Sequence, residues 1–132
     1  MVFYTAFFGR GPDRQNRTRF AQFRVGGTIL SLYNPQFDSD LIASGADVRG
    51  VYSDAYLAYS RTATIRYGNN VVLNFGVDDL AAKYTRVQKL ALGAVSDILY
   101  LNSAAPYYFF TLTDPDGNTL EITGPYEEPE ED

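Results

Sequence analysis

A pattern of strand, turn and strand in the last third of the chain constrains the fold more than any other feature of the sequence. Residues 106–113 (PYYFFTLT) and 119–123 (TLEIT) are rich in aromatic and β-branched residues, and the segment between them contains the sequence DPDG. Such residues favour strands, and Asp-Pro and Asp-Gly favour a tight reversal. Because a similar apolar run occupies residues 97–102, the region predicts a three-stranded antiparallel meander.

A strand and a helix are predicted immediately before this meander. Residues 70–77 (NVVLNFGV) form an apolar run with strand character. Asp78 or Asp79 then suits the N-cap of a helix that runs to about Leu92, and Gly93 suits its end. Residues 70–123 are therefore expected to form one unit of strand, helix and three strands.

The first third of the chain resembles a shortened copy of the same unit. Residues 2–8 predict a helix that ends at Gly9, and residues 20–25 and 28–33 predict a hairpin around Gly26 and Gly27. This self-similarity indicates internal duplication. No residues remain for a strand before the first helix, so we expect a neighbouring segment or a partner chain to fill that edge.

These units divide the chain into four segments that we expect to form one globular domain of α+β class. Residues 1–35 are interpreted as a degraded first module, 36–69 as a linker or insertion, 70–126 as the second module and 127–132 as a disordered acidic tail. Within the join between the modules, residues 34–38 and 44–47 are predicted to be loops. A lid, a short helix or the missing edge strand are alternatives for the rest of this insertion.

The sequence lacks two residue types that commonly act in catalysis and in metal binding. The 132 residues contain no Cys and no His, which excludes thiolate nucleophiles, imidazole bases and the metal ligands that these side chains supply. No segment approaches the roughly 20 consecutive apolar residues of a membrane span. With a net charge of −5, the chain is also a poor candidate for nucleic-acid binding. We therefore expect a cytoplasmic protein with neither a membrane nor a nucleic acid as partner.

The motifs of residues 109–124 (FFTLTDPDGNTLEITG) and 72–80 (VLNFGVDDL) resemble the vicinal oxygen chelate superfamily, which includes glyoxalase, the bleomycin-resistance proteins and the extradiol dioxygenases. The resemblance is close over residues 70–124 and looser over 3–33. It implies paired βαβββ modules that form a curved mixed sheet around a cavity, here without the first strand of the first module. It also implies a homodimer.

Metal-dependent members of this superfamily hold their ion with a carboxylate on the last strand and with histidines elsewhere. The resemblance places Glu121 at the carboxylate position, Ser31 at the equivalent position of the first module and Val72 at a position usually held by histidine. Because one ligand of the usual set remains, we expect no metal and no other cofactor.

Strand alternation predicts which side chains line the cavity. Glu121 lies between Leu120 and Ile122 and should face away from both. Burial would suit Glu121 for proton transfer or for binding a cation, although a carboxylate satisfied by an Arg or Tyr is an equal alternative. Exposure at the edge of the sheet, with no function, is an alternative explanation for the polar residues Asn74 and Thr111. The predicted ligand-binding residues are Ser31, Tyr33, Val72, Asn74, Phe109, Thr111 and Glu121.

These residues lead to three hypotheses about function. The first is a metal-independent protein that binds a small molecule in an aromatic cavity, as the bleomycin-resistance proteins do. The second is an enzyme, a lyase or isomerase of a small oxygenated metabolite, with Glu121 as its catalytic base. The third is an interaction protein with a vestigial pocket. Fold alone does not choose among them.

Overall fold

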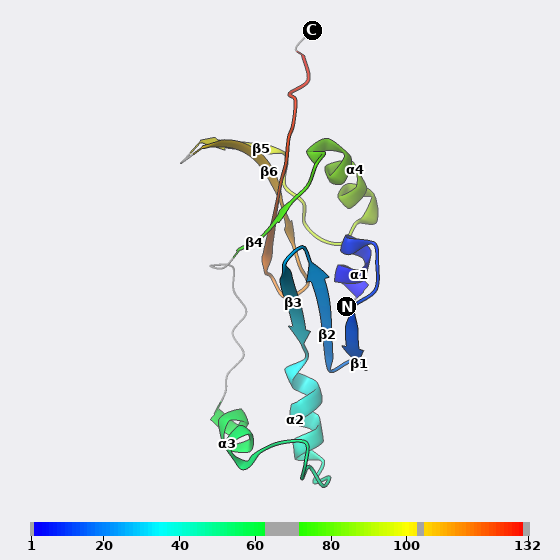
Figure 1. Ribbon diagram of the computed structural model, residues 1–132, viewed down its shortest axis with the longest axis vertical. Helices are drawn as coiled ribbons and strands as arrows, with labels where there is room; N and C mark the ends of the chain where they lie inside the picture. The colour runs from blue at the N-terminus through cyan, green and yellow to red at the C-terminus, as the bar shows by residue number, and fades with distance from the viewer. Residues whose placement is uncertain (1, 63–71, 103–104, 131–132) are drawn as a thin grey trace. The chain divides into compact units, whose positions relative to one another are not determined.

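The computed structural model describes residues 2–62, 72–102 and 105–130. Contacts divide the chain into two compact units. Unit 1 lies within Phe8–Arg66, and unit 2 combines Val2–Phe7 with residues of Tyr67–Asp132 (Figure 1). Both units contain helices and antiparallel strands, which confirms the predicted α+β class.

Unit 2 contains a four-stranded mixed sheet. Its elements are β4 (Val72–Gly76), α4 (Leu80–Leu90), β5 (Leu99–Asn102), β6 (Pro106–Thr113) and β7 (Thr119–Thr123). The strands lie in the order β4-β7-β6-β5, with β4 parallel to β7 and the other pairs antiparallel. This is the predicted unit of strand, helix and three strands.

The two faces of this sheet differ in composition. The helix-covered face is apolar, and its central side chains are fully buried: Phe110, Leu112, Leu120 and Ile122. Helix α4 packs there through Leu80 and Val87, both fully buried, and the ring of Tyr84 lies 5.1 Å from that of Phe110. The opposite face carries the polar positions of β4, β6 and β7.

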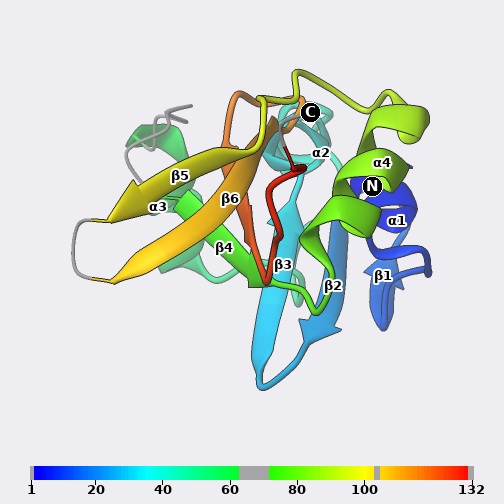
Figure 2. The same cartoon turned by 90° about the horizontal axis from the view of Figure 1, so that it is seen from above.

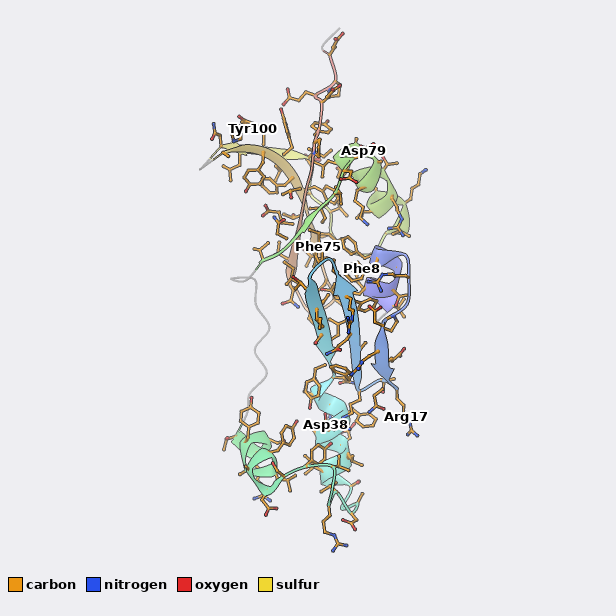
Figure 3. All side chains as sticks on the ribbon, in the orientation of Figure 1. Phe8, Arg17, Asp38, Phe75, Asp79 and Tyr100 are labelled. Carbon is orange, nitrogen blue, oxygen red and sulfur yellow. The ribbon has the colours of Figure 1, made fainter. Side chains whose placement is uncertain are left out.

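The first helix, α1 (Val2–Phe8), packs largely within unit 2. Its Phe7 ring lies 5.5 Å from the ring of Phe75 on β4, and Figure 3 labels Phe75. Lys83 Nζ and Arg86 Nη1 each donate to the Phe7 carbonyl at 3.0 Å, and Arg86 Nη2 donates to the Ala6 carbonyl at 2.9 Å. Helices α1 and α4 accordingly lie side by side in Figures 1 and 2.

This packing differs from the predicted segment 1–35, which grouped residues 2–8 with the hairpin that follows them. Contacts instead group Val2–Phe7 with unit 2. The physical reason is that the aromatic side chains of α1 need an apolar partner, and Phe75 supplies part of one.

The turn between β6 and β7 is closed by Asp114. Its Oδ1 accepts from the backbone N–H groups of Asp116 (3.0 Å) and Asn118 (2.8 Å), which is the side-chain turn that the DPDG sequence predicts. Its Oδ2 accepts from the hydroxyl of Tyr4 at 2.8 Å. Asp114 is buried, so this bond links α1 to the far end of the hairpin.

Unit 1 contains a three-stranded antiparallel sheet in the order β1-β2-β3. Strands β2 (Phe20–Val25) and β3 (Thr28–Tyr33) are the predicted hairpin. The sequence did not indicate β1 (Arg14–Asn16), because its three residues are polar and exposed. Ala21 and Phe23 are fully buried, and the Phe8 ring lies 5.0 Å from that of Phe23.

Two helices follow the sheet of unit 1, where the sequence analysis placed a linker. They are α2 (Pro35–Ala43) and α3 (Asp54–Thr62), so the loop predicted over residues 34–38 is wrong. Asn34 is the N-cap, and its side chain accepts from the Gln36 N–H at 3.1 Å. An Asn-Pro pair is typical of turns and equally of helix starts, because Pro suits the first helical turn. Residues 63–69 of the predicted linker lie outside the described residues.

The last described residues, 127–130, form no helix or strand. The Tyr108 hydroxyl nevertheless donates to Glu128 Oε1 at 2.9 Å, so this segment has a side-chain contact with β6; its predicted disorder stays a prediction. None of the described helices is long and apolar enough to span a membrane.

Candidate functional site

The polar face of the unit 2 sheet gathers five of the seven predicted ligand-binding residues. In the strand register, Asn74 on β4 pairs with Glu121 on β7, and Glu121 pairs with Thr111 on β6. Residues opposite one another on neighbouring strands have Cβ atoms about 5 Å apart. The three polar side chains therefore form a row across three strands, and we call this the Asn74–Glu121–Thr111 row.

Glu121 accepts a hydrogen bond from a neutral donor. Asn74 Nδ2 donates to Glu121 Oε1 at 3.2 Å, and Thr123 Oγ1 donates to Asn74 Oδ1 at 3.3 Å, which fixes the orientation of the amide. The hydroxyl of Tyr107 on β6 lies near this carboxylate: desolvation, and then the charge of Glu121 and hydrogen bonding to it, raise the pKa of Tyr107.

Two aromatic rings lie beside this row. Phe109 pairs with Thr123 in the register, and its ring centroid lies 5.3 Å from that of Tyr107. Val72, at the start of β4, pairs with Thr119 and is 45% exposed. The sequence analysis did not select Tyr107, although its position two residues before Phe109 places it on the same face by alternation.

The donor set of this face does not fit the metal site of the resembling family. Glu121 accepts from an amide, and Val72 stands at a position that the resemblance gives to histidine. Among the residues that the structure describes, no three His, Cys, Asp or Glu side chains are grouped so that they could hold a metal ion. Hard divalent cations take six or more oxygen ligands and are held tightly by several carboxylates, so one carboxylate beside an amide and a valine does not fit such an ion.

The two remaining predicted residues, Ser31 and Tyr33, belong to β3 of unit 1. Ser31 Oγ accepts from Gln22 Nε2 at 3.1 Å. The Tyr33 hydroxyl donates to Asp38 and lies 2.9 Å from the hydroxyl of Tyr56. Both side chains are therefore engaged within unit 1.

A buried carboxylate that the sequence analysis did not select organises unit 1. Asp38 on α2, labelled in Figure 3, is 2% exposed. It accepts from the hydroxyls of Tyr33 and Tyr52 and forms an ion pair with Arg19 Nη2 at 2.8 Å. Burial by itself raises the pKa of Asp38, but the two tyrosine hydrogen bonds and Arg19 outweigh it and hold the pKa below its usual value.

A surface depression of unit 2 lies away from the polar face. It has a volume of about 510 Å³ and lies on α4, lined by Ala82, Thr85, Arg86, Lys89 and Leu90. Because α4 packs on the apolar side of the sheet, this depression is separate from the Asn74–Glu121–Thr111 row.

Solved structures with the same fold include enzymes and binding proteins. Lactoylglutathione lyase from Agrobacterium tumefaciens matches with a TM-score of 0.57 and 21% identity, over 93% of this chain and 80% of that one. A glyoxalase-related enzyme from Fulvimarina pelagi matches with a TM-score of 0.59 and 14% identity, over 93% and 76%. A bleomycin-binding protein, solved with bleomycin, matches with a TM-score of 0.55 and 14% identity, over 95% and 86%.

These similarities establish the class of fold, that of the glyoxalase and bleomycin-resistance proteins. They confirm the resemblance drawn from the DPDG hairpin and the helix that starts at Leu80. No protein-family model and no curated protein sequence matches the chain. Function must therefore be argued from the polar face itself, since this fold carries both enzymes and binding proteins.

Proposed function

We propose that the protein binds a small organic molecule on the polar face of the unit 2 sheet, without a metal ion. The observation that carries this proposal is the Asn74–Glu121–Thr111 row beside the rings of Tyr107 and Phe109. Binding sites for small molecules combine aromatic walls with a few well-placed polar groups. The fold is shared with a protein that binds bleomycin, which supports binding as a role.

The hydrogen bond from Asn74 suits Glu121 to recognition. Asn74 donates to Glu121 Oε1, and Thr123 fixes that amide, so the carboxylate is held in one orientation, which is useful for recognition. The alternative of a lyase or isomerase gains no support from this arrangement.

The proposal is tested by titrating ¹⁵N-labelled protein with bleomycin and with a panel of small aromatic compounds. We expect the amide resonances of β4, β6 and β7 to shift for at least one compound. Phe109→Ala should weaken that binding about tenfold, because an aromatic contact contributes on the order of 1 kcal/mol beyond its buried area.

Tyr100→Ala is the matched control for this substitution. Tyr100 is an exposed aromatic residue on the neighbouring strand β5 and pairs with Tyr108, so its side chain lies on the other face from Phe109. It should leave the affinity unchanged. Shifts confined to α4, or equal losses for both variants, would refute binding on the polar face.

A further inference from the structure

The charges of unit 2 are separated between the two sides of its sheet. Among the described residues from 72 to 130, the cationic side chains are Lys83, Arg86 and Lys89, and all three belong to α4. Lys83 and Arg86 donate to the carbonyls at the end of α1. Since α4 packs on the apolar side of the sheet, the polar side of unit 2 holds Glu121 with no lysine or arginine of this unit on its face.

Glu121 has neutral partners where a carboxylate in a protein commonly has a cation. None of the ion pairs among the described residues includes Glu121. A carboxylate has about four acceptor positions, and Asn74 accounts for one of them. Acceptor capacity and a full negative charge therefore remain available to a ligand.

The rings beside Glu121 favour the same kind of ligand. The rings of Tyr107 and Phe109 lie 5.3 Å apart and are tilted by 31° to each other, so they form an aromatic surface on the same face as the carboxylate. Aromatic faces attract cations and flat apolar groups alike, and carboxylates bind amidinium and guanidinium groups with charge-assisted hydrogen bonds. An anionic ligand would meet only repulsion from Glu121.

We propose that the polar face of unit 2 selects organic cations, in which an amidinium, guanidinium or ammonium group bonds to Glu121 while an attached flat apolar body lies against Phe109. This inference rests on the proposed function and adds the charge of the ligand. It requires no rearrangement of the row, because Asn74 already orients the carboxylate.

Three compounds of the same shape and different charge test the inference: benzamidine (cation), benzamide (neutral) and benzoate (anion). Each is titrated into the ¹⁵N-labelled protein at pH 7. We expect benzamidine to shift the resonances around Asn74, Thr111 and Glu121 and to bind at least tenfold more tightly than benzamide, with benzoate weakest. Such small ligands bind weakly, so the test compares the ratio of their dissociation constants.

Two isosteric variants distinguish an effect of the charge at Glu121 from an effect of the net charge of the protein. Glu121→Gln should remove the preference for benzamidine and leave benzamide binding within twofold. Glu127→Gln makes the same change in net charge at an exposed residue, and it should retain the preference.

The outcomes distinguish failure of this inference from failure of the proposed function. Equal binding of the three compounds, or a preference that survives Glu121→Gln, overturns cation selection and leaves small-molecule binding intact. Binding of neutral compounds alone on β4, β6 and β7 does the same. Paramagnetic broadening by Mn²⁺ confined to the surroundings of Glu121 would assign the carboxylate to a metal ion and overturn both. Absence of binding by these compounds and by the whole aromatic panel also overturns both.

Discussion

Asp38 in unit 1 and Glu121 in unit 2 are both carboxylates that accept hydrogen bonds from neutral side chains, yet only one of them has a cation. Asp38 accepts from Tyr33 and Tyr52 and pairs with Arg19 at 2.8 Å. Glu121 accepts from Asn74 and has no ion pair among the described residues. The first group is thus neutralised by its own unit, and the second is not.

The difference follows from burial. Asp38 is 2% exposed, and a charge removed from water is tolerated only when it is paired and hydrogen-bonded. Glu121 is half-buried on an open sheet face, where solvent supports its charge. Asp38 therefore serves the stability of unit 1, whereas the charge of Glu121 is available for an external partner.

The largest effect is expected from Asp38→Asn. Removing the charge leaves Arg19 without its counter-ion inside the tyrosine cluster, which should cost about 3 kcal/mol of folding free energy. Urea denaturation of the variant and the wild type measures this difference. Asp40→Asn, at an exposed position of the same helix, should cost much less. Equal losses for the two variants would show that the ion pair of Asp38 contributes little.

Tyr4→Phe comes next and tests the buried carboxylate of unit 2. The Tyr4 hydroxyl donates to Asp114 Oδ2 at 2.8 Å, and the variant removes this bond while keeping the ring. We expect a loss of about 1.5 kcal/mol, because a buried acceptor loses one of its partners. Tyr100→Phe, with an exposed hydroxyl-bearing ring, should change the denaturation midpoint little. Asn118 Nδ2 also donates to this oxygen, at 2.9 Å, so a neutral result for Tyr4→Phe would mean that Asn118 alone satisfies it.

A smaller, pH-dependent effect on stability is expected from Asp38. The folded protein lowers the pKa of Asp38 below the ordinary value of 3.8. Its contribution to stability is therefore complete above that value and is lost as the pH falls through the lower, folded pKa. Denaturation curves between pH 6 and pH 2.5 should show a steeper acid loss for the wild type than for Asp38→Asn. Parallel curves would contradict the assignment.

The smallest effect on stability is expected from Glu121→Gln. The amide keeps the shape of the side chain and an oxygen that can accept from Asn74, and no buried cation loses its partner. We expect a change within about 0.5 kcal/mol, as for other substitutions at partly exposed positions. Thermal unfolding of this variant beside Asp38→Asn makes the comparison direct. A loss as large as that of Asp38→Asn would show that Glu121 is a structural group.

Much of the fold was predictable because strand alternation and turn chemistry act locally. The DPDG hairpin, the β2–β3 hairpin and the cap at Asp79 all followed from neighbouring residues. The incorrect predictions concerned contacts between residues that are distant in the sequence. Helix α1 joined unit 2 because an apolar helix packs where it finds apolar rings, and the tyrosines around Asp38 are separated in sequence from it and from one another.

The candidate site was predictable to a similar extent. Alternation placed Asn74, Thr111 and Glu121 on one face, and the register then set them opposite each other. Sequence could not show that the Tyr107 hydroxyl lies near Glu121, since that depends on the conformations of both side chains. Nor could it show that Tyr33 turns to Asp38, because the helix that carries Asp38 was predicted to be a loop.

The position of α1 has a consequence for how the chain folds during synthesis. Unit 2 is assembled from both ends of the sequence, because Val2–Phe7 packs with residues made more than 60 positions later. The helix leaves the ribosome before these partners and must wait for them, which raises the contact order of unit 2. A fragment without α1 would expose Phe75, which the Phe7 ring contacts, so deleting α1 should destabilise unit 2.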